Sequence, residues 1–93
     1  GQIPVARDGT TPADFLSQAR LAWANLAAQL AAGGMGLDDL VKVTIFLSDR
    51  RYADDNRRAR EEALGGRRIA LTIIIAGIFD PAWLLEIEAV AAR

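Results

Sequence analysis

The sequence predicts an α/β fold in which helices cover one face of a small sheet. Apolar and polar residues alternate over residues 38–48 and again over residues 84–92, as they do in half-buried strands. Two other segments space their apolar residues at helical intervals. With residues 1–5 as the tail of a further strand, the predicted order is strand, helix, strand, helix, strand, strand.

The first helix is predicted to begin at Thr11 and to end near Ala32. Thr11 is expected to cap it, Pro12 suits the first helical position, and Gly33 followed by Gly34 stops it. Five apolar residues at helical spacing are expected to face the sheet: Phe15, Ala19, Ala22, Leu26 and Leu30.

The opposite face of this helix has almost no charge, although a surface helix is usually polar there. A helix that is apolar on two sides is usually buried on both. This face is therefore predicted to be an interface with another chain, made of Leu16, Arg20, Leu21, Ala24, Ala27, Ala28 and Ala31.

The strand over residues 38–48 is expected to turn alternate apolar side chains toward the helices, namely Val41, Val43, Ile45 and Leu47. The second helix, over residues 49–64, has a thin inner stripe and an outer face of charge pairs. The stripe is Tyr52, Asn56, Ala59 and Ala63, and the pairs are Asp54–Arg58, Arg57–Glu61 and Arg58–Glu62.

Two more strands are predicted over residues 69–76 and 84–92, with a turn at 77–81. In the last strand, three apolar residues are expected on the helix-facing side: Leu85, Ile87 and Ala89. Glu86 and Glu88 are then expected together on the other side.

Composition excludes several classes of protein. The 93 residues suffice for one domain and include no cysteine and no histidine, which excludes a disulfide scaffold and a Cys/His zinc site. Seven arginines lie within residues 49–68, but five acidic residues lie among them, so a solvated, ion-paired face is favoured over a nucleic-acid site. The longest apolar run, residues 73–79, is far shorter than the roughly 18–20 residues that span a bilayer.

Several stretches carry a resemblance to a known family. They are Gly1-Gln2-Ile3-Pro4, the block Asp38-Asp39-Leu40-Val41-Lys42-Val43-Thr44-Ile45-Phe46-Leu47, Asn56, and the ending Leu85-Glu86-Ile87-Glu88-Ala89-Val90-Ala91. Over essentially its whole length the chain resembles the reactive intermediate deaminases, also called the Rid, YjgF or endoribonuclease L-PSP family. The resemblance implies a chorismate-mutase-like fold: a small mixed sheet with two helices on one face, assembled as a homotrimer with clefts between subunits.

The resemblance also implies site residues. It assigns the family's catalytic glutamate to Glu86 and places Ala70 where the deaminases have an arginine that binds the substrate carboxylate. An alanine cannot form that bidentate ion pair. The family has further strands before the segment that matches Gly1, and the single domain over residues 1–93 is expected to lack them.

Three functional hypotheses follow. The first is a catalytically silent Rid-like trimer that acts as an assembly module. Because the apolar face of the first helix resembles a computationally redesigned surface, this hypothesis takes the chain for an engineered cage component whose first helix contacts a copy or a designed partner. The second is an imine or enamine deaminase, or a ligand binder, that uses Glu86 in the cleft between subunits.

The third hypothesis is an RNA-binding or ribonuclease member of the family. On the leading hypothesis, Glu86 and Glu88 only line a polar trimer interior or pair with an arginine. No cofactor, metal, nucleic acid or membrane partner is expected, and a natural chain would be cytoplasmic.

Overall fold

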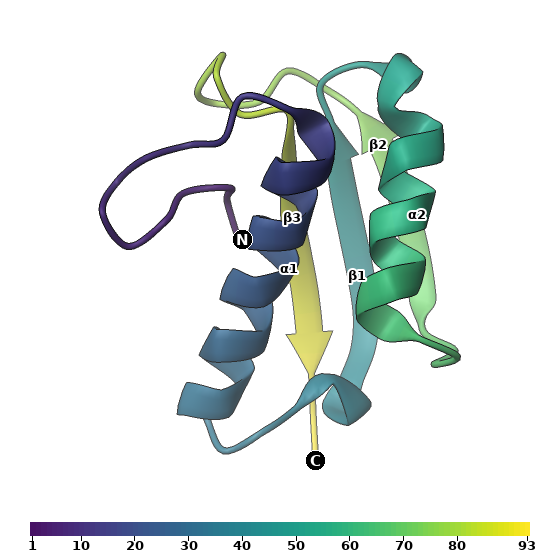
Figure 1. Cartoon of the computed structure of the whole chain (residues 1–93). Helices are drawn as coiled ribbons and strands as arrows, with labels where there is room; N and C mark the ends of the chain where they lie inside the picture. The colour runs from purple at the N-terminus through teal and green to yellow at the C-terminus, as the bar shows by residue number, and fades with distance from the viewer.

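Two helices cover one face of a three-stranded sheet in the computed structural model, which describes residues 1–93 (Figure 1). The predicted α/β class is confirmed. The elements are α1 (Phe15–Ala32), β1 (Leu40–Leu47), α2 (Ala53–Leu64), β2 (Ala70–Ile75) and β3 (Leu85–Ala91), with short 3₁₀ turns at Leu37–Asp39 and Arg50–Tyr52. No helix is both long and apolar enough to cross a membrane.

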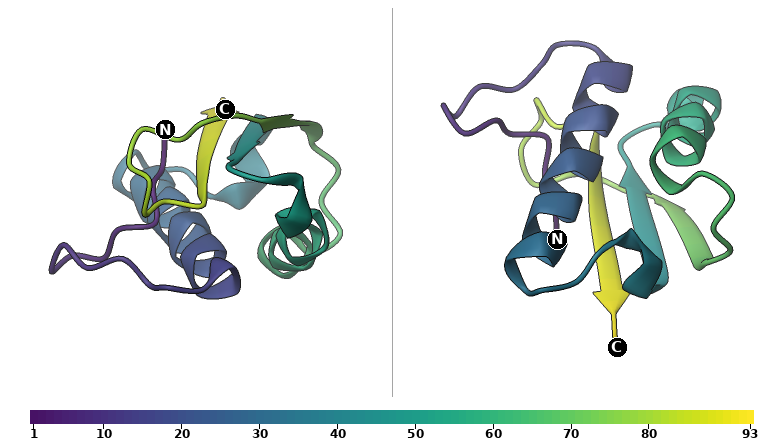
Figure 2. Two further views of the ribbon diagram at one scale, coloured as in Figure 1. Left: turned by 90° about the horizontal axis from the view of Figure 1, so that it is seen from above. Right: turned by 60° about the horizontal axis from the view of Figure 1, so that its bottom comes forward.

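The sheet is mixed, with β1 in the centre, β2 on one side and β3 on the other. β1 and β2 run parallel, so the chain must cross over between them, and α2 supplies that crossover. β3 runs antiparallel to β1. Viewed from above, both helices lie on the same side of the sheet, and no part of the chain covers the sheet's other side (Figure 2). We call that other side the open face.

α1 begins later than predicted, so the expected Thr11 cap is wrong. Asp14 is the N-cap: its backbone is extended and its carboxylate accepts a hydrogen bond from the Ser17 amide at 2.9 Å. Pro12 lies outside the helix, where its carbonyl accepts a hydrogen bond from the Gln18 side chain. The Asp14 carboxylate therefore satisfies the helix end that Thr11 was expected to cap.

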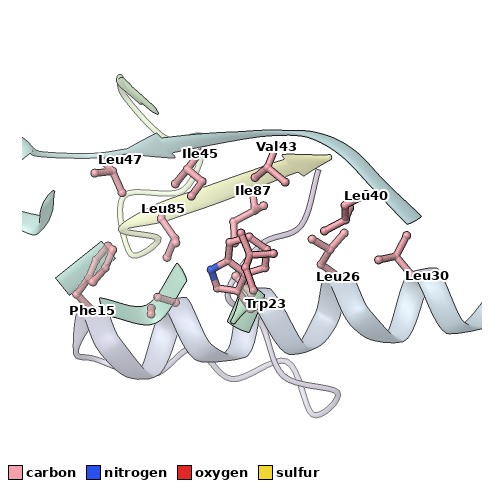
Figure 3. Close-up of a cluster of buried hydrophobic side chains, with 14 residues drawn as sticks. Phe15, Trp23, Leu26, Leu30, Leu40, Val43, Ile45, Leu47, Leu85 and Ile87 are labelled. Carbon is pink, nitrogen blue, oxygen red and sulfur yellow. The ribbon is translucent and has the colours of Figure 1, made fainter. Parts of the chain in front are cut away.

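The core lies between α1 and the sheet (Figure 3). All five residues predicted for the inner face of α1 are buried, and so are most of those predicted for the strands. The buried apolar residues are Phe15, Ala19, Ala22, Trp23, Leu26, Leu30, Leu40, Val43, Ile45, Leu47, Ala59, Leu64, Leu85 and Ile87.

Val41 is the exception, and its predicted burial is wrong. It is 53% exposed, while its neighbour Leu40 is buried. Leu40 pairs with Ala91 and Lys42 pairs with Val90. Two steps along β1 therefore match only one step along β3. Val41 is therefore the extra residue of a β-bulge, which reverses the alternation at the start of the strand.

α2 packs beside α1, and its inner stripe is as predicted: Asn56 and Ala59 are buried, and Tyr52 and Ala63 are half-buried. Tyr52 stacks on Phe15 with ring centroids 4.8 Å apart. Of the three predicted charge pairs, only Arg58–Glu62 is within ion-pair distance, at 4.0 Å. Asp54 instead pairs with Arg57, one residue closer along the helix.

The N-terminal segment contributes one bridge rather than a strand, because only Gln2 pairs with β3, opposite Ile87. Asn25 of α1 holds the following residues in place by donating hydrogen bonds of 3.0 Å to the carbonyls of Ile3 and Val5. The segment therefore lies between α1 and the edge of the sheet.

Candidate functional site: the open face of the sheet

The pairing register arranges the open face in three rows. Reading from β2 through β1 to β3, the rows are Ala70–Lys42–Val90, Thr72–Thr44–Glu88 and Ile74–Phe46–Glu86. Glu86 and Glu88 thus share this face, as predicted. Both point away from the helices, because Leu85 and Ile87, which alternate with them along β3, are fully buried in the core.

Glu86 lies against the start of the chain. Its side chain is half-buried, and Gly1 packs on its carboxylate so closely that a Cβ at that position would lie 2.5 Å from Oε2. Gln2 then pairs with Ile87, the next residue of β3. A side chain in place of Gly1 would therefore require the flexible Glu86 carboxylate to move.

Ala70 shares the open face with Glu86 but lies far from it. Their rows are four residues apart along β1, or about 13 Å at 3.3 Å per residue. Lys42 pairs with Ala70 and is the one basic residue within the three strands. A compact substrate, whose carboxylate and reacting carbon are neighbours, cannot touch both rows of one chain. Within one chain, Glu86 and the position of Ala70 therefore do not form one compact site.

Exposed apolar side chains concentrate on the sheet. Six of the seven large hydrophobic residues that are exposed belong to strands, and four of these belong to β2. They are Val41, Leu71, Ile73, Ile74, Ile75 and Val90. The seventh is Phe79 of the β2–β3 loop, which is 92% exposed and lies beside Trp83 with ring centroids 6.4 Å apart.

The residues of α1 that were predicted to form an interface are not all exposed for contact with another chain. Arg20, Ala24 and Ala27 face α2 of the same chain, and Leu16 is half-buried against the core. Leu21 is half-buried, which leaves Ala28 and Ala31 as the exposed members away from α2. The interface on α1 stays a prediction.

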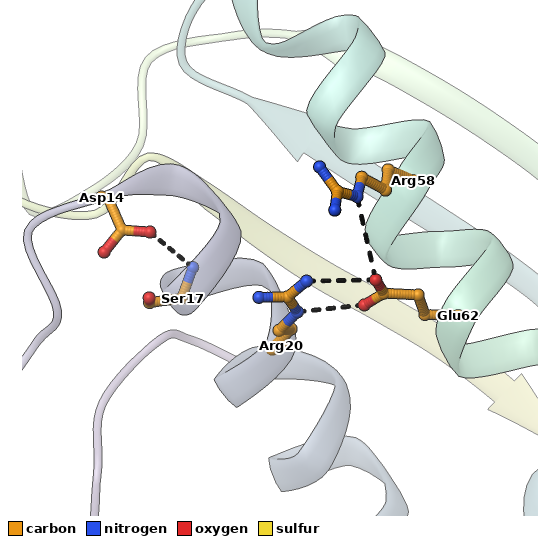
Figure 4. A network of polar contacts seen from close by, with 5 residues as sticks. All are labelled: Asp14, Ser17, Arg20, Arg58 and Glu62. Carbon is orange, nitrogen blue, oxygen red and sulfur yellow. Dashed lines mark hydrogen bonds and ion pairs between the residues drawn. The ribbon is translucent and has the colours of Figure 1, made fainter.

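The strongest polar contact between the helices joins Arg20 to Glu62 (Figure 4). Two guanidinium nitrogens of Arg20 donate to the two carboxylate oxygens at 3.0 and 3.1 Å. This hydrogen-bonded ion pair lowers the pKa of Glu62 and raises the pKa of Arg20. The side chains are 44% and 51% exposed, so solvent screens the pair and it contributes little to stability.

No group of three or more acidic, His or Cys side chains is arranged to hold a metal ion. Sequence reasoning overlooked Lys42 as a member of the site and overlooked the role of Gly1. The alternation in the strand that contains Lys42 was sufficient to place it opposite the core. No local signal marks Gly1, whose closeness to Glu86 depends on a pairing between the two ends of the chain.

Comparison with known proteins agrees with this fold. The endoribonuclease L-PSP family model matches residues 1–93. The RutC family protein YjgH of Escherichia coli is 49% identical over 49 residues, and the 2-iminobutanoate/2-iminopropanoate deaminase of the same species is 44% identical over 50 residues. These matches cover 53% of this chain but only 37% and 39% of those relatives, respectively.

Solved structures match over the whole chain. E. coli TdcF, crystallised with bound serine, superposes with a TM-score of 0.91 at 30% identity and covers 100% of this chain and 76% of that one. Yeast Mmf1 gives a TM-score of 0.93 at 23% identity, with 100% and 75% covered, and shows the shared fold. The match of the family model to every residue of the chain shows that it belongs to the endoribonuclease L-PSP (Rid) family.

Proposed function

We propose that the chain works as a symmetric oligomer, in which copies cover one another's open faces and form a cleft beside Glu86. We further propose that this oligomer does not hydrolyse 2-imino acids. Ile74 and Val90, which are exposed on the open face, support the first part, because exposed apolar side chains gather at association sites.

The observation that carries the second part is Ala70. It lies on the open face, at the position that the family resemblance assigns to a substrate-binding arginine. A 2-imino acid has a carboxylate that must be desolvated in a cleft, and an unpaired buried charge is costly. Lys42 is the nearest strand cation, but it lies about 13 Å along β1 from the row of Glu86.

Two measurements test the proposal. Native mass spectrometry is expected to give about 30 kDa, three times the 10.0 kDa chain. A deaminase assay with a freshly generated 2-imino acid is expected to show no turnover above the solvent rate. A mass of 10 kDa would overturn the association, and turnover that disappears in Glu86→Gln would overturn the catalytic part. Ala70→Arg is the matched variant, because it restores the missing guanidinium.

A second candidate is the hydrolysis of neutral imines, and the half-buried Glu86 carboxylate favours it. The Glu86 carboxylate would take a proton from a water molecule while the oxygen of that water adds to the imine carbon. The nitrogen would then be protonated and leave as an amine or ammonia, giving a carbonyl product. Hydrolysis of an imine without a carboxylate, lost in Glu86→Gln and kept in Glu88→Gln, would support this reaction. Equal rates in all three proteins would exclude it.

The assembly-module hypothesis adds a second contact through α1. The observation behind it is the exposure of Ala28 and Ala31, and Ala28→Lys is its test. A native mass above 30 kDa that corresponds to a multiple of three chains, and that falls to 30 kDa in this variant, would support a cage.

RNA binding has less support, because arginines of the charged segment pair with acidic residues of this chain.

A further inference from the structure

β2 forms one edge of the sheet, and its outer side has no partner strand within the chain. The amide of Ala76, directly after β2, donates to the Leu47 carbonyl of β1 at 2.9 Å. The backbone N–H and C=O groups of successive strand residues point to opposite sides of the strand, so the even-numbered residues of β2 face β1. The backbone groups of Leu71, Ile73 and Ile75 therefore face outward along the free edge.

The side chains of the same three residues continue a core layer that stops at this edge. Their pairing partners on β1 are fully buried: Val43, Ile45 and Leu47. On β2 the layer is 38% exposed at Leu71, 42% at Ile73 and 44% at Ile75, so α2 does not cover it. An apolar strand placed beside β2 would bury this remainder, which favours association.

β2 also has none of the features that protect most edge strands from pairing. Such strands usually carry a charged residue, a proline or a bulge. The six residues of β2 include no charge and no proline, and their pairing with β1 runs without a register shift. Four of the six are β-branched, which favours strand formation. The edge is therefore one to which a further strand can add.

An antiparallel second copy of β2 fits this edge. When Ile73 lies opposite Ile73 of the second copy, Leu71 falls opposite Ile75. The outward backbone groups of all three residues then meet as hydrogen-bonded pairs. Residues that lie directly opposite each other share a face of the sheet, so the apolar layer of one copy continues into that of the other.

The residues that flank β2 favour the antiparallel orientation. Arg68 lies two residues before the strand and Asp80 lies five residues after it. Neither side chain forms an ion pair within the chain. Antiparallel pairing brings the Arg68 end of each copy to the Asp80 end of the other, which places opposite charges together. Parallel pairing would place Arg68 beside Arg68.

We propose that β2 pairs edge to edge with β2 of a second copy, antiparallel and about a two-fold axis at Ile73. Two three-stranded sheets then form one six-stranded sheet. The pairing does not depend on the open face, because it joins copies along an edge and leaves that face free. Where open faces associate as well, it links two trimers. Only three residues of each copy form the contact, which places it among weak interfaces that need a high chain concentration.

The same substitution at two neighbouring residues separates the two contacts. Ile73→Lys places like charges opposite each other at the axis, whereas Ile74→Lys charges the open face. We measure mass by sedimentation at roughly millimolar chain concentration. Six 10.0 kDa chains, about 60 kDa, are expected for the parent, three chains for Ile73→Lys and two chains for Ile74→Lys.

Failure of the open-face association gives a different pattern. The parent is then expected as two chains and Ile73→Lys as one, so the edge pairing is still measured. Equal masses for the parent and Ile73→Lys would overturn the edge pairing in either case. Ala28→Lys, on the exposed side of α1, is expected to keep the parent mass. A mass that falls in this variant would assign the larger species to α1 and would also overturn the proposal.

Hydrogen exchange of the parent tests the same contact without a substitution. The amides of Leu71, Ile73 and Ile75 are expected to exchange about tenfold more slowly at high than at low chain concentration. The Ala76 amide is the internal control, because it is already bonded to β1 and is expected to be protected at both concentrations. Exchange at the three outward amides that does not depend on concentration would overturn the proposal.

Discussion

Gln18 is a buried polar residue that joins three separate parts of the chain. Its Nε2 donates to the carbonyls of Pro12 and Ala82 at 2.8 and 2.9 Å, and its Oε1 accepts from the Leu84 amide at 2.8 Å. The side chain is 1% exposed. It therefore fixes the approach to β3 against the start of α1, and with it the position of Glu86 two residues further on.

Gln18→Leu is expected to destabilise the chain well beyond an ordinary surface change. The leucine fills the space but leaves up to three backbone groups unpaired, each costing about 1–3 kcal/mol where it stays buried. Gln29→Leu is the matched control, because Gln29 lies exposed on the same helix. Urea denaturation of both variants measures the difference. Equal midpoints would mean that water replaces the Gln18 contacts without cost.

The Arg20–Glu62 pair predicts a specific dependence of stability on pH. The ordinary pKa of Glu62 is 4.5, and the folded chain lowers it, so the pair stabilises the fold above that pH. The gain is lost as the pH falls through the lower, folded pKa. Arg20→Met is therefore expected to be slightly less stable than the parent at pH 7 and equal to it well below pH 4.

Arg50→Met controls for the removal of an exposed arginine, since Arg50 forms no ion pair in the structure. Thermal melts of the three proteins from pH 3 to pH 7 measure the effect. A gap between Arg20→Met and the parent that persists at pH 3 would contradict the assignment to the Glu62 carboxylate.

At the scale of elements, periodicity predicted which helices and strands exist but not where their local irregularities fall. Helical spacing identified five of the seven buried residues of α1, because burial against a sheet imposes a 3.6-residue period, but it did not identify Gln18 or Trp23. The same reasoning failed at Val41, because a bulge adds one residue and a period of two cannot show it. The start of α1 was missed because two acceptable caps, Thr11 and Asp14, lie three residues apart.

The bulge predicts different outcomes for one substitution made at two neighbouring sites. Val43→Ala is expected to cost about 2 kcal/mol, since Val43 is fully buried and loses two methyl groups of packing. Val41→Ala is expected to stay within about 0.5 kcal/mol, because its side chain is already in solvent. Urea midpoints of the two variants at one protein concentration check this. Equal losses would indicate a regular strand with Val41 in the core.

For the whole molecule, sequence alone identified the fold and the sheet face that bears Glu86 and Glu88. It did not identify how the residues on that face are arranged relative to one another. The alternation of apolar and polar residues within a strand is local, so the sequence shows it directly. The distance of Glu86 from Ala70 depends on the strand order β2-β1-β3, and the contact of Glu86 with Gly1 depends on the bridge between Gln2 and Ile87; both pair distant parts of the chain. The pattern on β2 was misleading in another way, because all six of its residues are exposed although most are apolar.

If the chain associates as proposed, the exposure of β2 links its folding to that association. Only 17 of the 93 residues are buried within one chain, and β2 adds none to them, so covering the sheet would add a large share of the burial. A folded trimer that unfolds to three chains loses about 2.8 kcal/mol of trimer stability per tenfold dilution. The thermal midpoint is therefore expected to rise with chain concentration, and Ile74→Lys, which charges the open face, to remove that dependence. A midpoint independent of concentration in the parent would mean that the sheet is stable uncovered.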